Sequence, residues 1–265
     1  WPLPSMAPLA HTLALLAMAV ATAAIDVVHM NMVPDSFDDQ YRGCRDKMMA
    51  VLPALNRSEQ QQNKNFSQVW AKATAAWHNK KFTGSPLSSD QAIAIMAYTM
   101  NDVYEVFNNA VSIAGRSSQQ YREKFHFKTL HFLLTDALAT LRDSQGQQCC
   151  CVVRGVHNVQ FKAQIGDIVR FGRFASTSLC KDTADYFGTD TVFQVHTCHG
   201  VDIRDFSVFP QEEEVLVPPF ETFKVTDVTW DGKSPRIELR SAGTHSNYNC
   251  EWLQGDVTEG TTWGD

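Results

Sequence analysis

The sequence has no surplus of positive charge and no excess of glycine or proline. Lysine and arginine number 23 against 29 aspartates and glutamates, which gives a formal net charge of -6 over 265 residues. A nucleic-acid-binding domain needs a basic face, so this balance argues against that class and against a polybasic membrane-surface protein. With 14 glycines, 10 prolines and 44% hydrophobic residues, the chain cannot be collagen-like, low-complexity or wholly disordered. Its length suits one good-sized domain or at most two small ones.

Several motifs of cofactor and metal chemistry are also absent. The sequence contains no P-loop, no Rossmann glycine fingerprint, no His-Glu-x-x-His helix and no paired Cys-x-x-Cys. The neighbours Cys149, Cys150 and Cys151 cannot all point at one ion from a strand, because successive side chains alternate between its faces. Histidines flank Cys198, but an exposed or core-satisfied histidine is commoner than a ligand. We therefore expect no metal.

Seven cysteines are too few for a disulfide mini-scaffold. Because the number is odd, at least one thiol stays free or pairs with another chain.

An apolar stretch near the N-terminus has the pattern of a secretory signal peptide. It runs from Leu9 to Ala24 and ends in small residues, as a signal-peptidase site requires. It is too short for a membrane span, which needs roughly 20 residues to cross about 30 Å of hydrocarbon. We assign residues 1–24 to a signal peptide, in preference to the start of a buried helix. Residues 1–5 precede the first methionine and lie upstream of a possible initiator, Met6.

Two features downstream agree with secretion. Sequons begin at Asn56 and Asn65, both in polar surroundings, and predict a glycoprotein on the oxidising secretory route. Residues 252–265 form a polar tail that we expect to be flexible, without the hydrophobic end that a GPI-type anchor signal needs. We expect a secreted protein without a membrane anchor.

The pattern changes from helical to extended near residue 145. Apolar side chains recur at a three-to-four spacing over residues 93–110 and again over 130–141, where Thr129 is the expected N-cap. Beyond Gly146, short alternating runs bounded by glycine and proline predict strands. These runs cover residues 191–197, 214–217, 222–228 and 236–240.

Helices followed by strands indicate an α+β fold rather than alternating βαβ units. We expect one domain over residues 25–251, with a helical lobe over about 36–145 and a β lobe over about 146–240. No repeat or linker separates the lobes, so they should share a core.

The densest acidic point is Glu212-Glu213-Glu214, which runs directly into an apolar segment. In an extended chain Glu212 and Glu214 would face the same way and Glu213 the opposite way. Two carboxylates on one face repel each other, so the more buried one, Glu214, should have a raised pKa. On composition alone, a solvated acidic turn entering a strand is the commoner interpretation.

A same-face carboxylate pair is typical of glycosyl chemistry through an oxocarbenium-like transition state. A glycoside hydrolase is one version. In NAD the leaving nicotinamide is already cationic and needs no protonation, so one carboxylate can stabilise the ribosyl cation while the other orients or deprotonates an acceptor. The pyrophosphate needs a cation, for which Arg154 and Arg170 are candidates.

Three segments in order carry a resemblance to a known family. They are Val153-Arg154-Gly155-Val156-His157, the segment 170–178 with Ser176-Thr177-Ser178, and the segment 209–221 with the three glutamates. Together they resemble the vertebrate ecto-type mono-ADP-ribosyltransferases that modify arginine, the R-S-ExE group, related in fold to cholera-type toxins. The similarity extends from about His29 to Glu251.

The resemblance implies roles on the NAD side of a cleft. Arg154 would contact a phosphate of NAD, and the backbone of Gly155 would hydrogen-bond the nicotinamide carboxamide. Phe187 would stack on nicotinamide.

It also implies the catalytic set. Ser176 would hold Glu214 by a hydrogen bond, and Glu214 would bond a ribose hydroxyl and stabilise the oxocarbenium charge. Glu212 would engage the acceptor guanidinium, whose pKa above about 12 makes it non-nucleophilic until it is oriented and relieved of a proton.

Two disulfides are implied by the same resemblance: Cys44–Cys250 and Cys149–Cys198. Because Cys149 has cysteine neighbours, alternative partners for Cys198 stay open. Cys150, Cys151 and Cys180 have no assigned partner.

The resemblance therefore predicts an α+β fold with a helical lobe packed on a mixed two-sheet β core of the ADP-ribosylating toxin type. It implies an enzyme that moves ADP-ribose from NAD, with NADP as a related donor, to arginines of extracellular or luminal proteins. NAD is the co-substrate, nicotinamide is released, and a monomer is expected. The alternatives are an NAD glycohydrolase and a non-catalytic secreted binding protein of the same fold.

Overall fold

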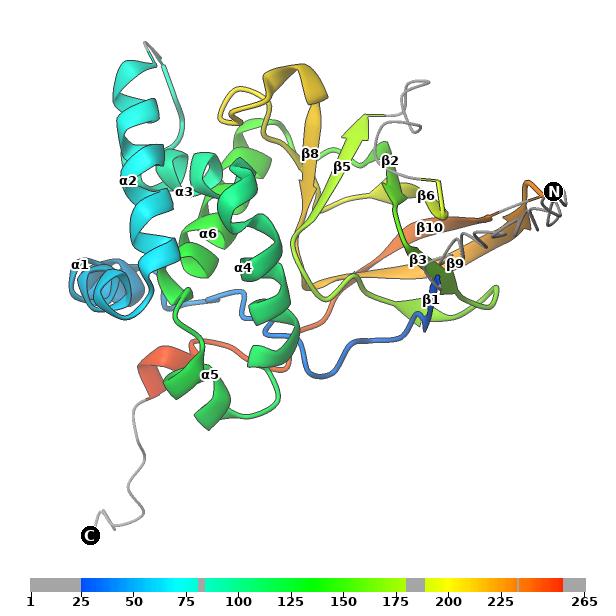
Figure 1. The fold of residues 1–265 in the computed structure, drawn as a ribbon, viewed down its shortest axis with the longest axis horizontal. Coiled ribbons are helices and arrows are strands. Elements are labelled where there is room, and N and C mark those ends of the chain that lie inside the picture. Colours follow the sequence, from blue (N-terminus) through cyan, green and yellow to red (C-terminus); the bar gives the residue numbers. More distant parts are fainter. Residues whose placement is uncertain (1–24, 81–83, 180–188, 233, 255–265) are drawn as a thin grey trace, which may run out of the picture.

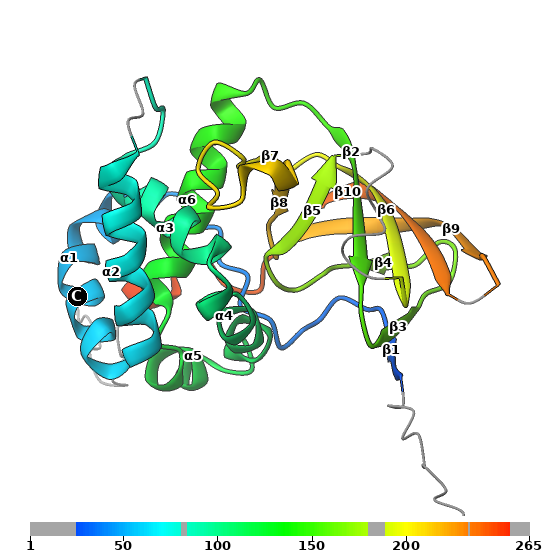
Figure 2. The same cartoon turned by 45° about the horizontal axis from the view of Figure 1, so that its top comes forward.

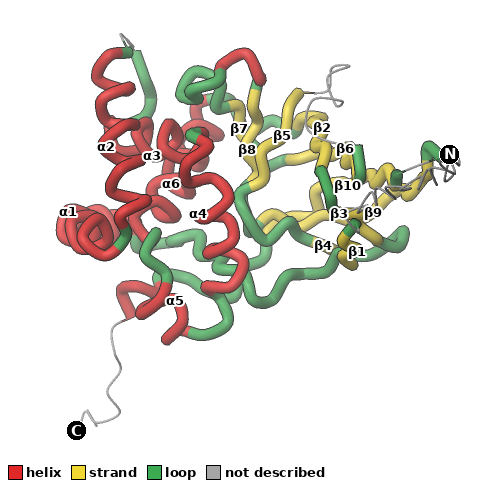
Figure 3. The backbone as a smooth tube through the Cα atoms, in the orientation of Figure 1, coloured by secondary structure: helices red, strands yellow, loops and turns green. Residues whose placement is uncertain are grey.

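The computed structural model describes residues 25–80, 84–179, 189–232 and 234–254. Helices gather on one side of the molecule and strands on the other (Figures 1 and 3). The expected signal peptide lies outside the described residues, as does most of the expected polar tail. A 3-10 helix, Glu251–Gln254, lies where the expected domain meets that tail.

The helical side is built from six α-helices within the described residues. They are α1 (Arg45–Gln62), α2 (Lys64–Asn79), α3 (Ser89–Thr99), α4 (Asn101–Ala114), α5 (Ser118–Lys124) and α6 (Lys128–Ser144). Helix α3 is buried on all sides over most of its length, because its sequence from Ala92 to Tyr98 is apolar around the whole circumference. Helix α6 is buried from Lys128 to Leu138, although this stretch includes polar side chains such as those of His131 and Asp136. The other helices surround these two.

The strands form two sheets. They are β1 (Asp26–His29), β2 (Cys150–Val156), β3 (Val159–Lys162), β4 (Ile168–Val169), β5 (Ala175–Leu179), β6 (Thr191–Thr197), β7 (Val201–Asp202), β8 (Glu214–Val217), β9 (Glu221–Trp230) and β10 (Pro235–Thr244). Strands β1 and β3 pair in parallel, and the other eight have the order β4-β9-β10-β6-β2-β5-β8-β7. Strands β7 and β8 lie at the end of this sheet nearest the helices (Figure 2).

Two apolar clusters fill the molecule. The larger one joins the helices to the near end of the sheet through Phe174, Phe206 and Leu216. The smaller one lies along the sheet and includes Phe193 and Phe223. Because the larger cluster contains residues of both halves, the helices and strands share a core.

The N-terminus of α6 is capped differently from the sequence-based expectation. Thr129 was expected as the N-cap, but the helix begins at Lys128 and the Thr129 side chain makes no hydrogen bond in the described residues. The carboxylate of Glu59, from α1, instead accepts hydrogen bonds from the backbone N–H groups of Lys128 (2.7 Å) and Thr129 (2.8 Å). A distant side chain therefore does what a local one was expected to do.

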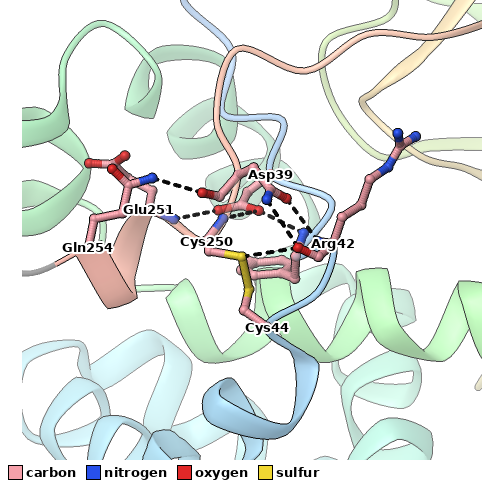
Figure 4. Close-up of a disulfide and its surroundings, with 8 residues drawn as sticks. Asp39, Arg42, Cys44, Cys250, Glu251 and Gln254 are labelled. Atoms are coloured by element: carbon pink, nitrogen blue, oxygen red, sulfur yellow. Dashed lines mark hydrogen bonds between the residues drawn. A yellow bond between two sulfur atoms is a disulfide. The ribbon is translucent and has the colours of Figure 1, made fainter.

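The start of α1 is joined to the C-terminal segment of the described chain. The Cys44–Cys250 disulfide links positions 206 residues apart, and Asp39 lies next to it (Figure 4). One oxygen of Asp39 accepts a hydrogen bond from the N–H of Cys250 at 2.9 Å, and the other accepts from Glu251 at 2.9 Å.

Within the described residues, no helix is both long enough and apolar enough to span a membrane.

Candidate active site

A cavity of about 360 Å³ lies where β2, β5 and β8 face the junction of α3 and α4. It is lined by Thr99, Asn101, Tyr104, Arg154, Gly155, Val156, His157, Ser176, Phe209, Glu212 and Glu214. The structure thus brings together the five predicted site residues that it describes: Arg154, Gly155, Ser176, Glu212 and Glu214. Phe187 lies outside the described residues, so its predicted position beside the cavity stays a prediction.

Glu214 is the buried acid of the cavity. It is the first residue of β8, and 6% of its surface is exposed. Burial, with a smaller contribution from the Glu212 charge, raises the pKa of Glu214 to about 7. The hydroxyl of Ser176 and the charge of Arg154 oppose this shift. The site therefore holds a carboxyl whose charge changes near neutral pH.

Ser176 is itself held by residues that the sequence analysis missed. Its hydroxyl lies 3.3 Å from the phenol oxygen of Tyr98 on α3, and Tyr98 donates to the carbonyl of Phe174 at 2.9 Å. Asn108 on α4 donates to the Tyr98 oxygen at 3.3 Å and accepts from the N–H of Phe174 at 3.1 Å. Nothing in the apolar periodicity of α3 and α4 distinguishes these two polar positions from their neighbours.

Arg154 lies in the middle of the sheet, on β2. One guanidinium nitrogen donates to the carbonyl of Ser176 at 2.6 Å, and the other reaches the hydroxyl of Tyr104 at 3.5 Å. Arg154 also lines a second cavity, of about 390 Å³, whose wall includes Arg173. The two cavities therefore share Arg154.

Arg170 and Arg173, three residues apart, lie in different surroundings. Arg170 is buried, and its guanidinium is paired with Asp38 at 2.6 Å, so it cannot meet a phosphate. Arg173 makes no ion pair or hydrogen bond within the described part of the chain. Burial, followed by the positive charge of Arg154, lowers its pKa.

The turn that carries Glu212 is not the extended chain expected from the sequence. Pro210–Glu212 forms a 3-10 turn, and Glu213 has left-handed backbone angles (φ 47°, ψ 46°) before the strand begins at Glu214. Glu212 is exposed at the surface. Its carboxyl is nevertheless partly desolvated by its surroundings, which raises the pKa of the group. Both carboxylates line the cavity because of this turn rather than because of strand alternation.

The structure contains both disulfides implied by the resemblance. Cys149–Cys198 ties the residue before β2 to the residue after β6, next to the strand that carries Arg154. Cys151, left without a partner in the sequence analysis, is disulfide-bonded, whereas Cys150 is a free thiol whose pKa is raised by burial. Cys180 lies outside the described residues.

One group of residues has the composition of a metal site. Potential ligand atoms of Cys149, His196 and Cys198 lie within 4.8 Å of one another. The two sulfurs are bonded to each other, however, and a disulfide sulfur is not the thiolate that metal ligation requires.

The predicted sequon residues lie on two neighbouring helices. Asn65 is exposed on α2, whereas Asn56 is half-buried on α1 and accepts a hydrogen bond from Gln60 at 2.9 Å.

Known proteins resemble this chain over most of its length. A family model described as NAD:arginine ADP-ribosyltransferase matches residues 30–247. An erythroblast NAD(P)(+)--arginine ADP-ribosyltransferase from Gallus gallus is 52% identical over 234 residues, which cover 87% of this chain and 78% of that protein. A GPI-linked NAD(P)(+)--arginine ADP-ribosyltransferase 1 from Mus musculus is 46% identical, covering 85% and 73%.

A solved structure has the same fold. The crystal structure of the mono-ADP-ribosyltransferase ART2.2 covers 84% of this chain and 98% of its own, with 34% sequence identity and a TM-score of 0.74. Structures of two ART2.2 mutants contain NADH and NAD. The expected α+β fold of the ADP-ribosylating type is therefore confirmed, as is the enzyme family. This chain belongs to the NAD:arginine ADP-ribosyltransferase family.

Proposed function

We propose that the protein transfers ADP-ribose from NAD to arginine side chains of proteins and releases nicotinamide. The observation that carries the proposal is one cavity lined by two carboxylates, of which one is buried and the other exposed. Glu214 is buried beside Ser176 and Arg154, and Glu212 is exposed two residues earlier. The names of the relatives support both the donor and the arginine acceptor, and the NAD-bound mutants of ART2.2 support NAD as the substrate.

The residues present fit a dinucleotide diphosphate. Arg154, which lines both cavities, and Arg173, which lines the second, form a pair of neighbouring cations, and such a pair is unfavourable until an anion lies between or beside them. Arg154 and Arg173 would bind the pyrophosphate, and the backbone of buried Gly155 would bond the nicotinamide carboxamide. NADP is a related donor, consistent with the NAD(P) in the names of the relatives.

Glu214 would act on the anomeric carbon of the NAD ribose, which exchanges its bond to nicotinamide for a bond to the acceptor. The bond between the ribose anomeric carbon and the nicotinamide nitrogen breaks, and its electron pair leaves with nicotinamide, which becomes neutral. The ionised Glu214 carboxylate stabilises the positive charge that develops on the ribose, while Ser176 holds the carboxylate in place. Burial makes this charge interaction stronger than it would be in water.

Glu212 would act on the acceptor. A guanidinium has no lone pair to attack with until a proton is removed, and its pKa lies above about 12. The exposed carboxylate of Glu212 would orient the guanidinium, accept that proton and direct the freed nitrogen to the ribose. Without an acceptor, water would complete the same reaction as NAD hydrolysis.

The test uses labelled NAD, a small guanidino acceptor and non-reducing buffer. Wild-type protein is expected to form a labelled acceptor, Glu214→Gln to lose both transfer and nicotinamide release, and Glu212→Gln to lose transfer while keeping hydrolysis. Glu238→Gln is the matched control, because Glu238 is an exposed carboxylate on β10.

Failure of the wild type to release nicotinamide would contradict an enzyme and favour a binding protein of this fold. Nicotinamide release without a labelled acceptor would instead favour an NAD glycohydrolase.

We also propose that the protein is a secreted monomer that acts on extracellular or luminal proteins. The signal-like segment, the sequons and the disulfides support this location. Expression in animal cells should give active protein in the medium, with a mass that falls on treatment with an N-glycosidase. Retention of all activity inside the cells would contradict it.

A further inference from the structure

The turn that carries Glu212 is held by backbone and side-chain hydrogen bonds. Its backbone is closed by hydrogen bonds from the N–H of Glu212 to Phe209 (3.0 Å) and from the N–H of Glu213 to Pro210 (3.3 Å). Ser178 donates to the carbonyl of Glu212 at 3.0 Å. Glu213 has φ 47°, a conformation unfavourable for any residue with a Cβ, so the turn needs further support.

Arg204 connects this turn to β7. One of its guanidinium nitrogens lies 3.3 Å from the carboxylate of Glu213. Another lies 2.6 Å from Asp202, and the Nε group contacts both oxygens of the same carboxylate at 2.9 and 3.1 Å. The planar guanidinium is thus held along one edge by Asp202 and presents its other edge to Glu213.

The segment that carries Arg204 is fixed to the rest of the molecule. The N–H of Ile203 donates to the carbonyl of Glu214 at 3.0 Å, and Phe206 is buried in the helical core. Lys80 from the end of α2 donates to the carbonyl of Asp205, and Val208 donates to Thr99 at 3.2 Å. Arg204 therefore connects a strained turn to a rigid support.

We propose that Arg204 is a positioning residue that holds the Glu212 turn for the arginine acceptor. This inference rests on the proposed transferase function. Its effect falls on Glu212 rather than Glu214, because Glu214 is held in β8, where it pairs with Ser178 of β5. Loss of Arg204 should therefore impair use of the acceptor and spare cleavage of NAD.

The experiment measures transfer and hydrolysis in Arg204→Gln, Arg204→Lys, Glu213→Gln and the double variant Arg204→Gln/Glu213→Gln. In Arg204→Gln the KM for a small guanidino acceptor should rise about three- to tenfold, as expected for loss of a partly exposed ion-pair network. The KM for NAD and the rate of hydrolysis without acceptor should stay within about twofold. The acceptor KM of Arg204→Lys should lie between those of wild type and Arg204→Gln, because lysine keeps the positive charge but lacks the planar, forked guanidinium.

The double variant tests whether the two side chains act together. If Arg204 works through Glu213, adding Glu213→Gln to Arg204→Gln should cause little further loss of transfer. Arg236→Gln is the matched control, because it breaks a partly exposed ion pair (2.9 Å to Asp231) at the far hairpin of β9 and β10.

Two outcomes would overturn the positioning role in a wild type that transfers normally. One is an unchanged ratio of transfer to hydrolysis in Arg204→Gln, and the other is an equal fall of both activities at unchanged melting temperature. A wild type that hydrolyses NAD but never labels the acceptor would contradict the proposed function itself. If Arg204→Gln does not fold, the Arg204→Lys ratio decides between the same outcomes.

Discussion

At the scale of single residues, Glu214 combines a functional requirement with a cost in stability. Its carboxyl must be ionised to stabilise a ribosyl cation, yet burial raises its pKa from 4.5 to about 7. The folded protein therefore binds this proton more tightly than the unfolded chain does. Stability from the group is fully present below pH 4.5 and is lost as the pH rises through about 7.

The first prediction follows from this fall in stability with rising pH. Because glutamine is never charged, Glu214→Gln should match wild type near pH 4.5 and exceed its free energy of unfolding at pH 8 by up to ~3 kcal/mol. Urea unfolding of both proteins at the two pH values measures the difference. A glutamine variant that is less stable than wild type at pH 8 would show that the charge of Glu214 is well compensated.

The second prediction is that Arg170 contributes to stability and Arg173, three residues later, to NAD binding. Sequence alone could not tell which would face a phosphate, because both lie in the same short segment and burial depends on distant partners. Arg170→Gln should destabilise the fold by about 3–5 kcal/mol, because it leaves the buried carboxylate of Asp38 without its cation. Arg173→Gln should instead raise the KM for NAD about tenfold with little change in melting temperature.

Titrating NAD and unfolding both arginine variants checks this contrast. The assignment of the pyrophosphate to Arg173 would be wrong if the variant bound NAD like wild type. Arg236→Gln, an exposed arginine outside both cavities, is the control for charge removal.

At the scale of elements, strands with an apolar run could be predicted from the sequence and polar strands could not. The segment 214–217 was predicted with the bounds that β8 has, since its apolar run begins at a defined point. Strand β5 was not predicted as a strand, because Ser176, Thr177 and Ser178 have the composition of a turn. Those hydroxyls are used by contacts distant in sequence, such as the 2.6 Å bond from Thr177 to the carbonyl of Val215.

At the N-terminus of α6, the distant residue Glu59 has the capping role that was expected of Thr129. This leads to the third prediction. Glu59→Gln should lower the free energy of unfolding by about 1–3 kcal/mol, because the amide offers one acceptor where two N–H groups need partners. Thr129→Val should change it by less than about 1 kcal/mol, since the hydroxyl makes no hydrogen bond in the described residues. Chemical denaturation measures both changes in the free energy of unfolding. A larger loss in Thr129→Val than in Glu59→Gln would indicate that Thr129 caps the helix.

At the scale of the whole molecule, covalent and non-covalent links together hold the segment before α1 to the C-terminal segment. Residue patterns that resemble a family pointed to Cys44–Cys250, but not to the carboxylates beside it. Asp38 and Asp39 bond backbone groups more than 200 residues away, and no periodicity in the chain records such a contact. The cleft residues depend on these links only indirectly, because the cavity lies at the junction of α3, α4 and the sheet.

The last prediction separates stability from activity at this scale. Replacing Cys44 and Cys250 by serine opens a loop of 206 residues, and chain entropy alone sets the loss at about 5 kcal/mol of unfolding free energy. The Asp39 hydrogen bonds to the C-terminal segment remain, so the folded variant should keep a wild-type KM for NAD at low temperature. Replacing Cys149 and Cys198, which close 49 residues, should cost slightly less stability but raise the KM for NAD, because that bond anchors the strand of Arg154. Thermal unfolding and NAD titration of both double variants provide the comparison, and an equal effect of the two on the KM for NAD would contradict it.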